Sequence, residues 1–204
     1  MKKSKKDSYH HPDLRSDLVK AVLTLVQKKG ARGFSLNEAS RLAGVSVAAP
    51  YRHFADKDAL LAEVAREGNE LMARELREAS SKSELIEERF MDTALAYIRF
   101  AKVHRDYFAV MFGSGIDKSH YPEVVSSAAD AFSIVLGLSN MVEKTPALAL
   151  DFAVTCWGLT HGLAMLDGEG ALAHATQRKT EPNVFRAIFQ RFLDQRFQSL
   201  TGQQ

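Results

Sequence analysis

Cysteine is nearly missing from this chain of 204 residues, which contains a single one, Cys156. One cysteine excludes an internal disulfide framework and is typical of proteins kept in a reducing compartment. No apolar run approaches the length of about 18 residues that a transmembrane helix needs. The basic N-terminal stretch is not followed by the apolar segment of a secretory signal. We therefore expect a cytoplasmic protein without a membrane-spanning segment.

The sequence also lacks the residue patterns of common enzymes and metal proteins. It has no HExxH segment, no paired Glu-x-x-His motifs and no glycine-rich phosphate loop. His10 and His11 lie in the N-terminal tail, where a histidine pair is more often incidental than a metal site. We expect no enzyme, and hence no catalytic residue, no metal and no cofactor. The alternative is a helical-bundle enzyme, or a ligand-binding or adaptor protein that does not bind DNA; measurable turnover would favour the enzyme.

Positive and negative charges nearly balance over the whole chain, but positive charge is in excess in the N-terminal part. The net charge is only +2, yet residues 1–60 hold 12 Lys and Arg against 6 Asp and Glu, and the remainder holds 15 against 19. A basic N-terminal part on a mildly acidic body is typical of a phosphate-binding module joined to a second function. Residues 1–7 contribute half of this excess, so a solubilising tail explains part of it. We predict residues 1–12 to be a disordered basic tail.

Apolar residues recur at the helical period of 3.6 throughout the chain, so we predict an all-α fold of about nine helices. In the first predicted helix Leu18, Val22 and Leu25 share one stripe, and Gly30 follows its end. Longer helices are predicted at Lys57–Ala79 (capped by Asp56), Ser83–His104, 105–112, Glu123–Glu143, Pro146–Leu166 and Asn183–Ser199. Residues 167–182 are predicted to form a polar connector.

The segment SLNEASRLAGVSVAAPYRHFADKDALL contains the most informative pattern of the chain. Ser35 with Glu38 three residues later forms a capping box that opens a second helix, and Gly44 ends that helix after about two turns. Ser46 is placed to cap a third helix at Val47–Phe54. Two short helices joined by a turn with a glycine are typical of a helix-turn-helix, whose second helix enters the major groove of DNA.

This segment resembles the DNA-binding motif of the TetR family of bacterial transcription repressors. The resemblance rests on Ala-Gly-Val-Ser at 43–46, on Tyr-Arg-His-Phe at 51–54 and on Lys57 three residues later. It covers about residues 14–64. The segment WGLTHGL at 157–163 resembles the Trp-His-Gly signature in the C-terminal domain of one subgroup of the family.

The resemblance implies a homodimeric repressor that binds a palindromic operator in double-stranded DNA and is released by a small-molecule effector. It implies a helix-turn-helix DNA-binding domain of three helices at residues 13–58, and a C-terminal helical bundle for ligand binding and dimerisation at residues 59–204. Phe54 is expected to pack in the core. The sequence departs from the family pattern at Ala48, near which the family usually has glycine, and at Pro50. This proline removes one backbone hydrogen bond, which we expect to be a small loss so close to a helix start.

The candidate DNA contacts follow from the chemistry of the side chains in the motif. Tyr51, His53 and Lys57 suit phosphate oxygens, whereas the apolar residues that open the predicted third helix can only touch thymine methyl groups. Asn37 suits an adenine edge, and Arg52 suits either guanine or phosphate. The predicted DNA-binding residues are Ser35, Asn37, Ser46, Val47, Ala48, Ala49, Tyr51, Arg52, His53 and Lys57. For Tyr51, core packing is the alternative.

Candidates for an effector pocket are aromatic, histidine and methionine residues on apolar helical faces. They are Tyr97, Phe100, His104, Phe108, Met111, Phe112, Trp157 and His161. Plain core packing is the alternative for each of them. The abundance of phenylalanine and methionine suggests an apolar or aromatic effector.

The predicted helices at Pro146–Leu166 and Asn183–Ser199 are apolar around most of their circumference. A helix that is apolar all round is buried on several sides, so we expect these two helices to form a homodimer interface. An ordinary intrachain core is the alternative. The candidate interface residues are Phe152, Leu159, Leu163, Phe185, Phe189 and Phe192.

Overall fold

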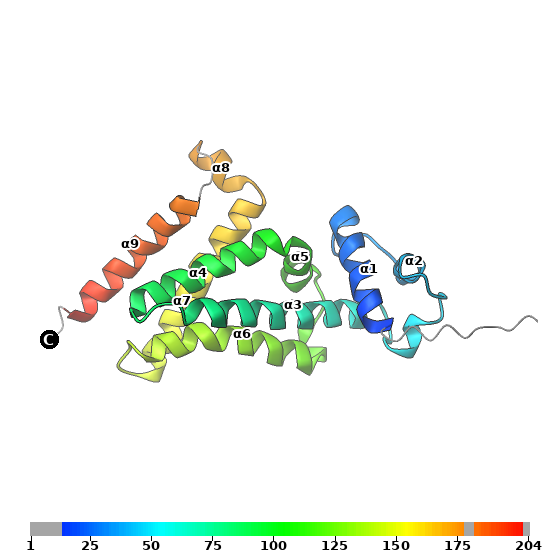
Figure 1. Cartoon of the computed structure of the whole chain (residues 1–204), viewed down its shortest axis with the longest axis horizontal. Helices are drawn as coiled ribbons and strands as arrows, with labels where there is room; N and C mark the ends of the chain where they lie inside the picture. Colours follow the sequence, from blue (N-terminus) through cyan, green and yellow to red (C-terminus); the bar gives the residue numbers. More distant parts are fainter. Residues whose placement is uncertain (1–13, 178–181, 202–204) are drawn as a thin grey trace, which may run out of the picture.

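The computed structural model describes residues 14–177 and 182–201 (Figure 1). The basic tail predicted at residues 1–12 lies outside the described residues. The elements are α1 (Leu14–Lys29), α2 (Leu36–Leu42), η1 (Pro50–Arg52), α3 (Lys57–Ser80), α4 (Ile86–Val103), α5 (Arg105–Gly113), η2 (Lys118–His120), α6 (Pro122–Asn140), α7 (Pro146–Gly168), α8 (Ala171–Thr176) and α9 (Pro182–Thr201), where η marks a 3-10 helix. The predicted all-α fold is confirmed, with nine α-helices and no strand in the described part of the chain.

Helix α3 connects the two ends of the molecule. It runs along the long axis, with α1 and α2 at one end and α9 toward the other (Figure 1). Helices α4 and α6 lie on either side of it, and α7 packs against both of them. Because α3 also packs against α1 and α5, a shift of this one helix would move the N-terminal helices relative to the C-terminal bundle.

The signals predicted for both ends of α2 and for the start of α3 are confirmed. The Ser35 side chain accepts a hydrogen bond from the Glu38 N–H, and the Glu38 carboxylate accepts one from the Ser35 N–H at 2.9 Å, which completes the capping box of α2. The Asp56 carboxylate accepts a bond from the Ala59 N–H at 2.8 Å and starts α3. Gly44 has a φ of 70°, a conformation that glycine adopts without the steric cost of a Cβ atom. These local contacts fix where α2 and α3 begin and where α2 ends.

The buried core extends from the N-terminal helices into the bundle. One cluster runs from Leu18 of α1 through Leu61 of α3 to Phe100 of α4. A second cluster packs Phe90 of α4 against Phe152 of α7, with ring centroids 5.2 Å apart. Burial of each such side chain contributes about 1.5–3 kcal/mol to folding. The N-terminal helices therefore share apolar contacts with the bundle instead of forming a core of their own.

Among the described residues, α7 is the one helix long and apolar enough to cross a membrane, with a mean hydropathy of 1.2. One of its faces is buried in the bundle through Phe152, Ala153 and Cys156. The other face leaves Leu150 and Val154 exposed. A core helix of a soluble protein passes the same test, so the length and composition of α7 are weak evidence for a membrane span.

The polar connector predicted at residues 167–182 is partly helical. Helix α7 continues to Gly168, and the short helix α8 follows. Gly170, with a φ of 70°, separates the two helices. A helix of six residues carries too little apolar periodicity to be recognised from the sequence.

Candidate nucleic-acid interface and effector cavity

The segment between α2 and α3 contains the 3-10 helix η1, so the α-helix predicted at Val47–Phe54 is wrong. The Ala49 N–H donates to the Ser46 carbonyl at 3.0 Å, and the Arg52 N–H donates to the Ala49 carbonyl at 3.2 Å, which is the spacing of 3-10 turns. Pro50 has no N–H, so it cannot bond the Ser46 carbonyl four residues earlier. In so short a segment the missing bond changes the helix type. The predicted cap by Ser46 is also wrong, because Ala49 occupies the N-cap position without a side-chain bond.

The inner side of this segment is anchored in the core, and its outer side is exposed. Phe54 is buried, as predicted, and Pro50 is buried beside it. Val47 and Tyr51 keep 47% and 58% of their surface exposed. Among the predicted DNA contacts, Ser35, Asn37, Ser46, Val47, Ala48, Tyr51, Arg52 and His53 are exposed, and Ala49 and Lys57 are half-buried. The segment thus presents apolar, aromatic and basic side chains together at one end of the molecule.

Lys57 has contacts inside the protein that no sequence pattern indicated. Its ammonium donates to the Arg32 carbonyl at 2.8 Å and lies 4.3 Å from the centroid of the Phe34 ring. Partial burial, followed by the nearby Arg32 charge, lowers the pKa of the ammonium. Lys57 therefore supports the loop between α1 and α2 in this structure, and a phosphate contact would have to compete with that role.

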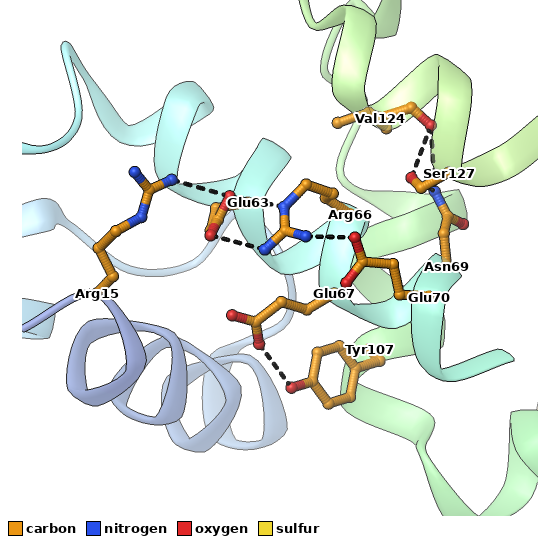
Figure 2. A network of polar contacts seen from close by, with 9 residues as sticks. All are labelled: Arg15, Glu63, Arg66, Glu67, Asn69, Glu70, Tyr107, Val124 and Ser127. Carbon is orange, nitrogen blue, oxygen red and sulfur yellow. Dashed lines mark hydrogen bonds and ion pairs between the residues drawn. The ribbon is translucent and has the colours of Figure 1, made fainter. Parts of the chain in front are cut away.

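An ion-pair network joins α1 to α3 (Figure 2). Glu63 accepts a bond from Arg15 of α1 at 3.0 Å and bonds from Arg66 at both of its oxygens, each at 3.0 Å. Arg66 also pairs with Glu70 one turn further along α3. Hydrogen bonds from Arg66, and then from Arg15, hold the pKa of Glu63 below its usual value against the opposing effect of burial. The spacing of three and four residues within α3 is visible in the sequence, but the pairing with α1 is not.

A second set of polar contacts joins α3 to α5 and α6 (Figure 2). The Tyr107 hydroxyl donates to Glu67 at 3.2 Å, and burial raises the pKa of this carboxyl group. The buried Asn69 amide donates to the Val124 carbonyl at 3.3 Å and to the Ser127 hydroxyl at 3.1 Å. Successive turns of α3 are therefore tied to the N-terminal helices on one side and to the bundle on the other.

A third contact connects the loop after α1 with the loop after α5. The Arg32 guanidinium donates to the Ser114 carbonyl and pairs with Asp58 at 3.1 Å. Phe112 lies two residues before Ser114 in the chain, and Lys118 lies four residues after it. Both of these flanking residues line the cavity described next.

A cavity of about 180 Å³ lies in the bundle among α3, α4, α6 and α7. It is lined by Asn69, Met72, Leu76, Phe90, Thr93, Ala94, Tyr97, Phe112, Lys118, Ala128, Ala131, Phe132, Val135, Cys156, Trp157, Thr160 and Phe189. Three predicted effector residues, Tyr97, Phe112 and Trp157, belong to this lining. Most of the lining is apolar, as in a typical small-molecule site, although the volume is smaller than the roughly 300 Å³ of the smallest usual pockets.

The other five predicted effector residues do not line the cavity. They are Phe100, His104, Phe108, Met111 and His161. The three apolar ones are buried in the core. His104 pairs with Glu75 at 2.9 Å, and the Nδ1 atom of His161 shares a hydrogen bond of 2.8 Å with the Tyr97 hydroxyl. His161 therefore supports a cavity residue instead of facing the cavity itself.

The residues predicted for the dimer interface differ in how far they are buried within their own chain. Phe152, Leu163, Phe185 and Phe189 are buried within their own chain, and a side chain buried in this way has no surface to offer a partner. Leu159 and Phe192 are half-buried. The exposed large apolar residues of α7 are Leu148, Leu150, Val154, Trp157, Met165 and Leu166. Apolar periodicity alone does not separate a face buried within the chain from a face available to a partner.

Comparison with known proteins agrees with this architecture. Residues 18–64 match the family "Bacterial regulatory proteins, tetR family", and residues 90–195 match the family "Tetracyclin repressor-like, C-terminal domain". No curated protein matches the chain.

Solved structures include several similar chains. A protein of unknown function from Rhodococcus sp. RHA1 has 28% identity and a TM-score of 0.76, with 91% of this chain and 98% of that chain covered. A bacterial regulatory protein in the tetR family from Rhodococcus RHA1 has 16% identity and a TM-score of 0.66, with 88% and 94% covered. The TetR-family regulator PfmR from Thermus thermophilus has 14% identity and a TM-score of 0.58, with 84% and 94% covered.

The two family matches coincide with the N-terminal helices and with the bundle, and they indicate a DNA-binding transcription regulator that is not an enzyme. The chain belongs to the TetR family of bacterial regulatory proteins.

Proposed function

We propose that this protein is a cytoplasmic repressor that binds a palindromic operator as a homodimer and is released from DNA by a small molecule. The observation that carries the proposal is the combination, in one chain, of an exposed recognition segment at one end and an apolar cavity next to the helix that supports that end. The segment WGLTHGL at 157–163, with Trp157 in the cavity lining, further supports membership of the Trp-His-Gly subgroup.

On the DNA side, the exposed residues of the recognition segment divide into two chemical groups. Tyr51, Arg52 and His53 offer hydrogen-bond donors to phosphate oxygens, and these contacts position the protein without reading sequence. Val47 and Ala48 offer only apolar surface, which suits the methyl group of thymine. Base reading by hydrogen bonds then falls to the exposed Asn37 and to Arg52.

A homodimer is supported by the exposed face of α7. Leu150, Val154 and Trp157 are four and three residues apart and form one apolar stripe on the outside of the bundle. Gly158 and Gly162 border this stripe, and a Cβ atom added at either of them would meet nothing within 4 Å. A partner helix can therefore approach the backbone closely at these glycines. In a dimer with two-fold symmetry the same stripe would meet its own copy.

Coupling between ligand and DNA would use two connections from the cavity. One is α3, which lines the cavity through Met72 and Leu76 and is tied to α1 by the Arg15–Glu63 ion pair. The other is the loop between α5 and α6, whose flanking residues line the cavity while its Ser114 carbonyl accepts a bond from Arg32. A ligand that fits one arrangement of these elements better than the other would shift the spacing of the two DNA-binding ends.

DNase I footprinting on the DNA upstream of the protein's own gene tests this proposal. We expect a protected segment with two inverted half-sites, whose centres lie about 10 base pairs or a multiple of that distance apart. The matched control is the same duplex with both half-sites scrambled. Absence of a protected segment at protein concentrations that saturate typical specific sites would overturn the proposed DNA-binding function.

A further inference from the structure

The cavity contains one charged residue, Lys118, among seventeen lining residues that are otherwise neutral. Lys118 opens η2, is half-buried, and holds its ammonium 5.4 Å from the centroid of the Phe112 ring. No carboxylate of the described residues lies within ion-pair distance of this ammonium, and burial lowers its pKa. Removal of a cation from water without an anionic partner is costly, so this arrangement favours an anion from outside the chain.

The neutral polar groups of the lining already have partners within the chain. The Thr93 hydroxyl donates to the Arg89 carbonyl at 2.7 Å, and the Thr160 hydroxyl donates to the Cys156 carbonyl at 2.7 Å. The amide donors of Asn69 and the hydroxyl of Tyr97 are engaged as described above. Lys118 is therefore the charged group of the described lining, and none of the ion pairs among the described residues includes it.

His161 does not compete with Lys118 as a second cation. Burial, followed by the positive charge of Lys118, lowers the pKa of its imidazole, so the ring stays neutral near pH 7. Among the described lining residues, the positive charge is therefore the ammonium of Lys118, in a lining that is mostly apolar.

We propose that the cavity binds an amphipathic organic acid, with an aromatic or aliphatic body among the apolar residues and one carboxylate paired with Lys118. The volume of about 180 Å³ exceeds the roughly 150 Å³ of an engineered cavity that holds benzene, which leaves room for one ring and a short chain. This inference rests on the proposed function in one respect, which is that the cavity is the effector site.

The test uses the full-length protein and three probes of the same shape. They are 4-phenylbutyrate, the neutral 4-phenylbutanamide and the cationic 4-phenylbutylamine. Binding is followed by titration calorimetry and by the fluorescence of Trp157, which lines the cavity and is the single tryptophan of the chain. We expect the acid to bind at least tenfold more tightly than the amide, because an ion pair in a partly desolvated site adds to the apolar contacts that the two probes share. The amine should bind more weakly than the amide.

Three variants assign this preference to Lys118. Lys118→Met should remove the preference, so that acid and amide bind equally, while Lys118→Arg should retain it. Lys144→Met, which removes an exposed lysine outside the cavity lining, should bind all three probes as the wild type does. Circular dichroism of each variant establishes that it is folded.

Two results would overturn the inference. The first is a wild-type protein that shows no preference for the acid over the amide, or that does not bind the acid at millimolar concentration. The second is a preference for the acid that survives in a folded Lys118→Met variant. Neither measurement involves DNA. A protein that binds its operator but shows no acid preference therefore refutes this inference alone. A protein that prefers the acid but binds no DNA refutes the proposed function alone.

Discussion

Replacement of Tyr51 by phenylalanine removes one hydroxyl group and leaves the ring in place. The residue is 58% exposed, and its hydroxyl has no hydrogen bond with the described residues, so the free energy of unfolding should change by less than about 0.5 kcal/mol. If this hydroxyl donates to a phosphate in the complex, its removal should cost about 1.5 kcal/mol of binding free energy for each DNA-binding end. This figure is the lower value for a hydrogen bond to a charged group. That corresponds to roughly tenfold weaker binding per end, and to about a hundredfold for a symmetric dimer.

Fluorescence anisotropy with a labelled operator duplex measures the change over a range of salt concentrations. The Tyr51→Phe variant should lose affinity by a similar factor at every salt concentration, because it removes no positive charge and releases no fewer counterions. The matched variant Arg52→Gln, at a neighbouring exposed position, should reduce the slope of log K against log salt by about 2 per dimer. Unchanged affinity of a folded Tyr51→Phe variant would refute the phosphate contact, and a lower melting temperature would show that the hydroxyl has a structural role.

Two further predictions concern the framework that holds the recognition segment. Gly33→Ala should lower the free energy of unfolding, measured in urea, by about 3 kcal/mol, because the new Cβ would lie 2.0 Å from the Lys29 carbonyl oxygen. The control Gly137→Ala, where a Cβ meets nothing within 4 Å, should raise the free energy of unfolding by about 0.5–1 kcal/mol. Equal effects of the two substitutions would contradict the steric argument. Arg66 and Arg15 lower the pKa of Glu63 in the folded protein. The ionised Glu63 side chain therefore contributes fully to the free energy of unfolding above the unfolded pKa of about 4.3, and this contribution is lost as the pH falls through the folded pKa. Glu63→Gln should therefore be about 1 kcal/mol less stable than the wild type at pH 7, with a difference that shrinks below about pH 4; a difference that does not depend on pH would contradict the ion-pair assignment.

The helix ends that depend on local interactions could be predicted from the sequence. The capping box of Ser35 and Glu38, the cap by Asp56 and the positive φ of Gly44 each depend on residues a few positions apart, so the ends of α2 and the start of α3 could be predicted. The α-helix predicted at Val47–Phe54 was wrong because the effect of Pro50 was larger than expected. The loss of one backbone bond is small in a long helix, but in a segment of a few residues it decides between an α-helix and a 3-10 helix.

Tertiary placement was less predictable, because it depends on how each helix is rotated in the bundle. Tyr97 lies on an apolar face of α4 and Phe108 on an apolar face of α5, so the sequence does not distinguish them. Of the two, Tyr97 lines the cavity and Phe108 does not. Lys118 follows a loop without any apolar pattern, so no sequence signal placed it in the cavity lining. Phe189 satisfies the apolar periodicity of a dimer interface and lies instead in the core of its own chain.

Site-directed photo-cross-linking can show whether the segment around η1 faces DNA in the complex. The native Cys156 is buried, and burial raises the pKa of its thiol to about 12, so a cysteine introduced on the surface can be labelled selectively with an aryl azide. We expect the label at Ala48→Cys to cross-link to the operator duplex, and the same label at Ala129→Cys, an exposed position on α6, to give no cross-link. Cross-linking from Ala129→Cys and none from Ala48→Cys, with operator binding intact in both variants, would show that the segment around η1 does not face DNA.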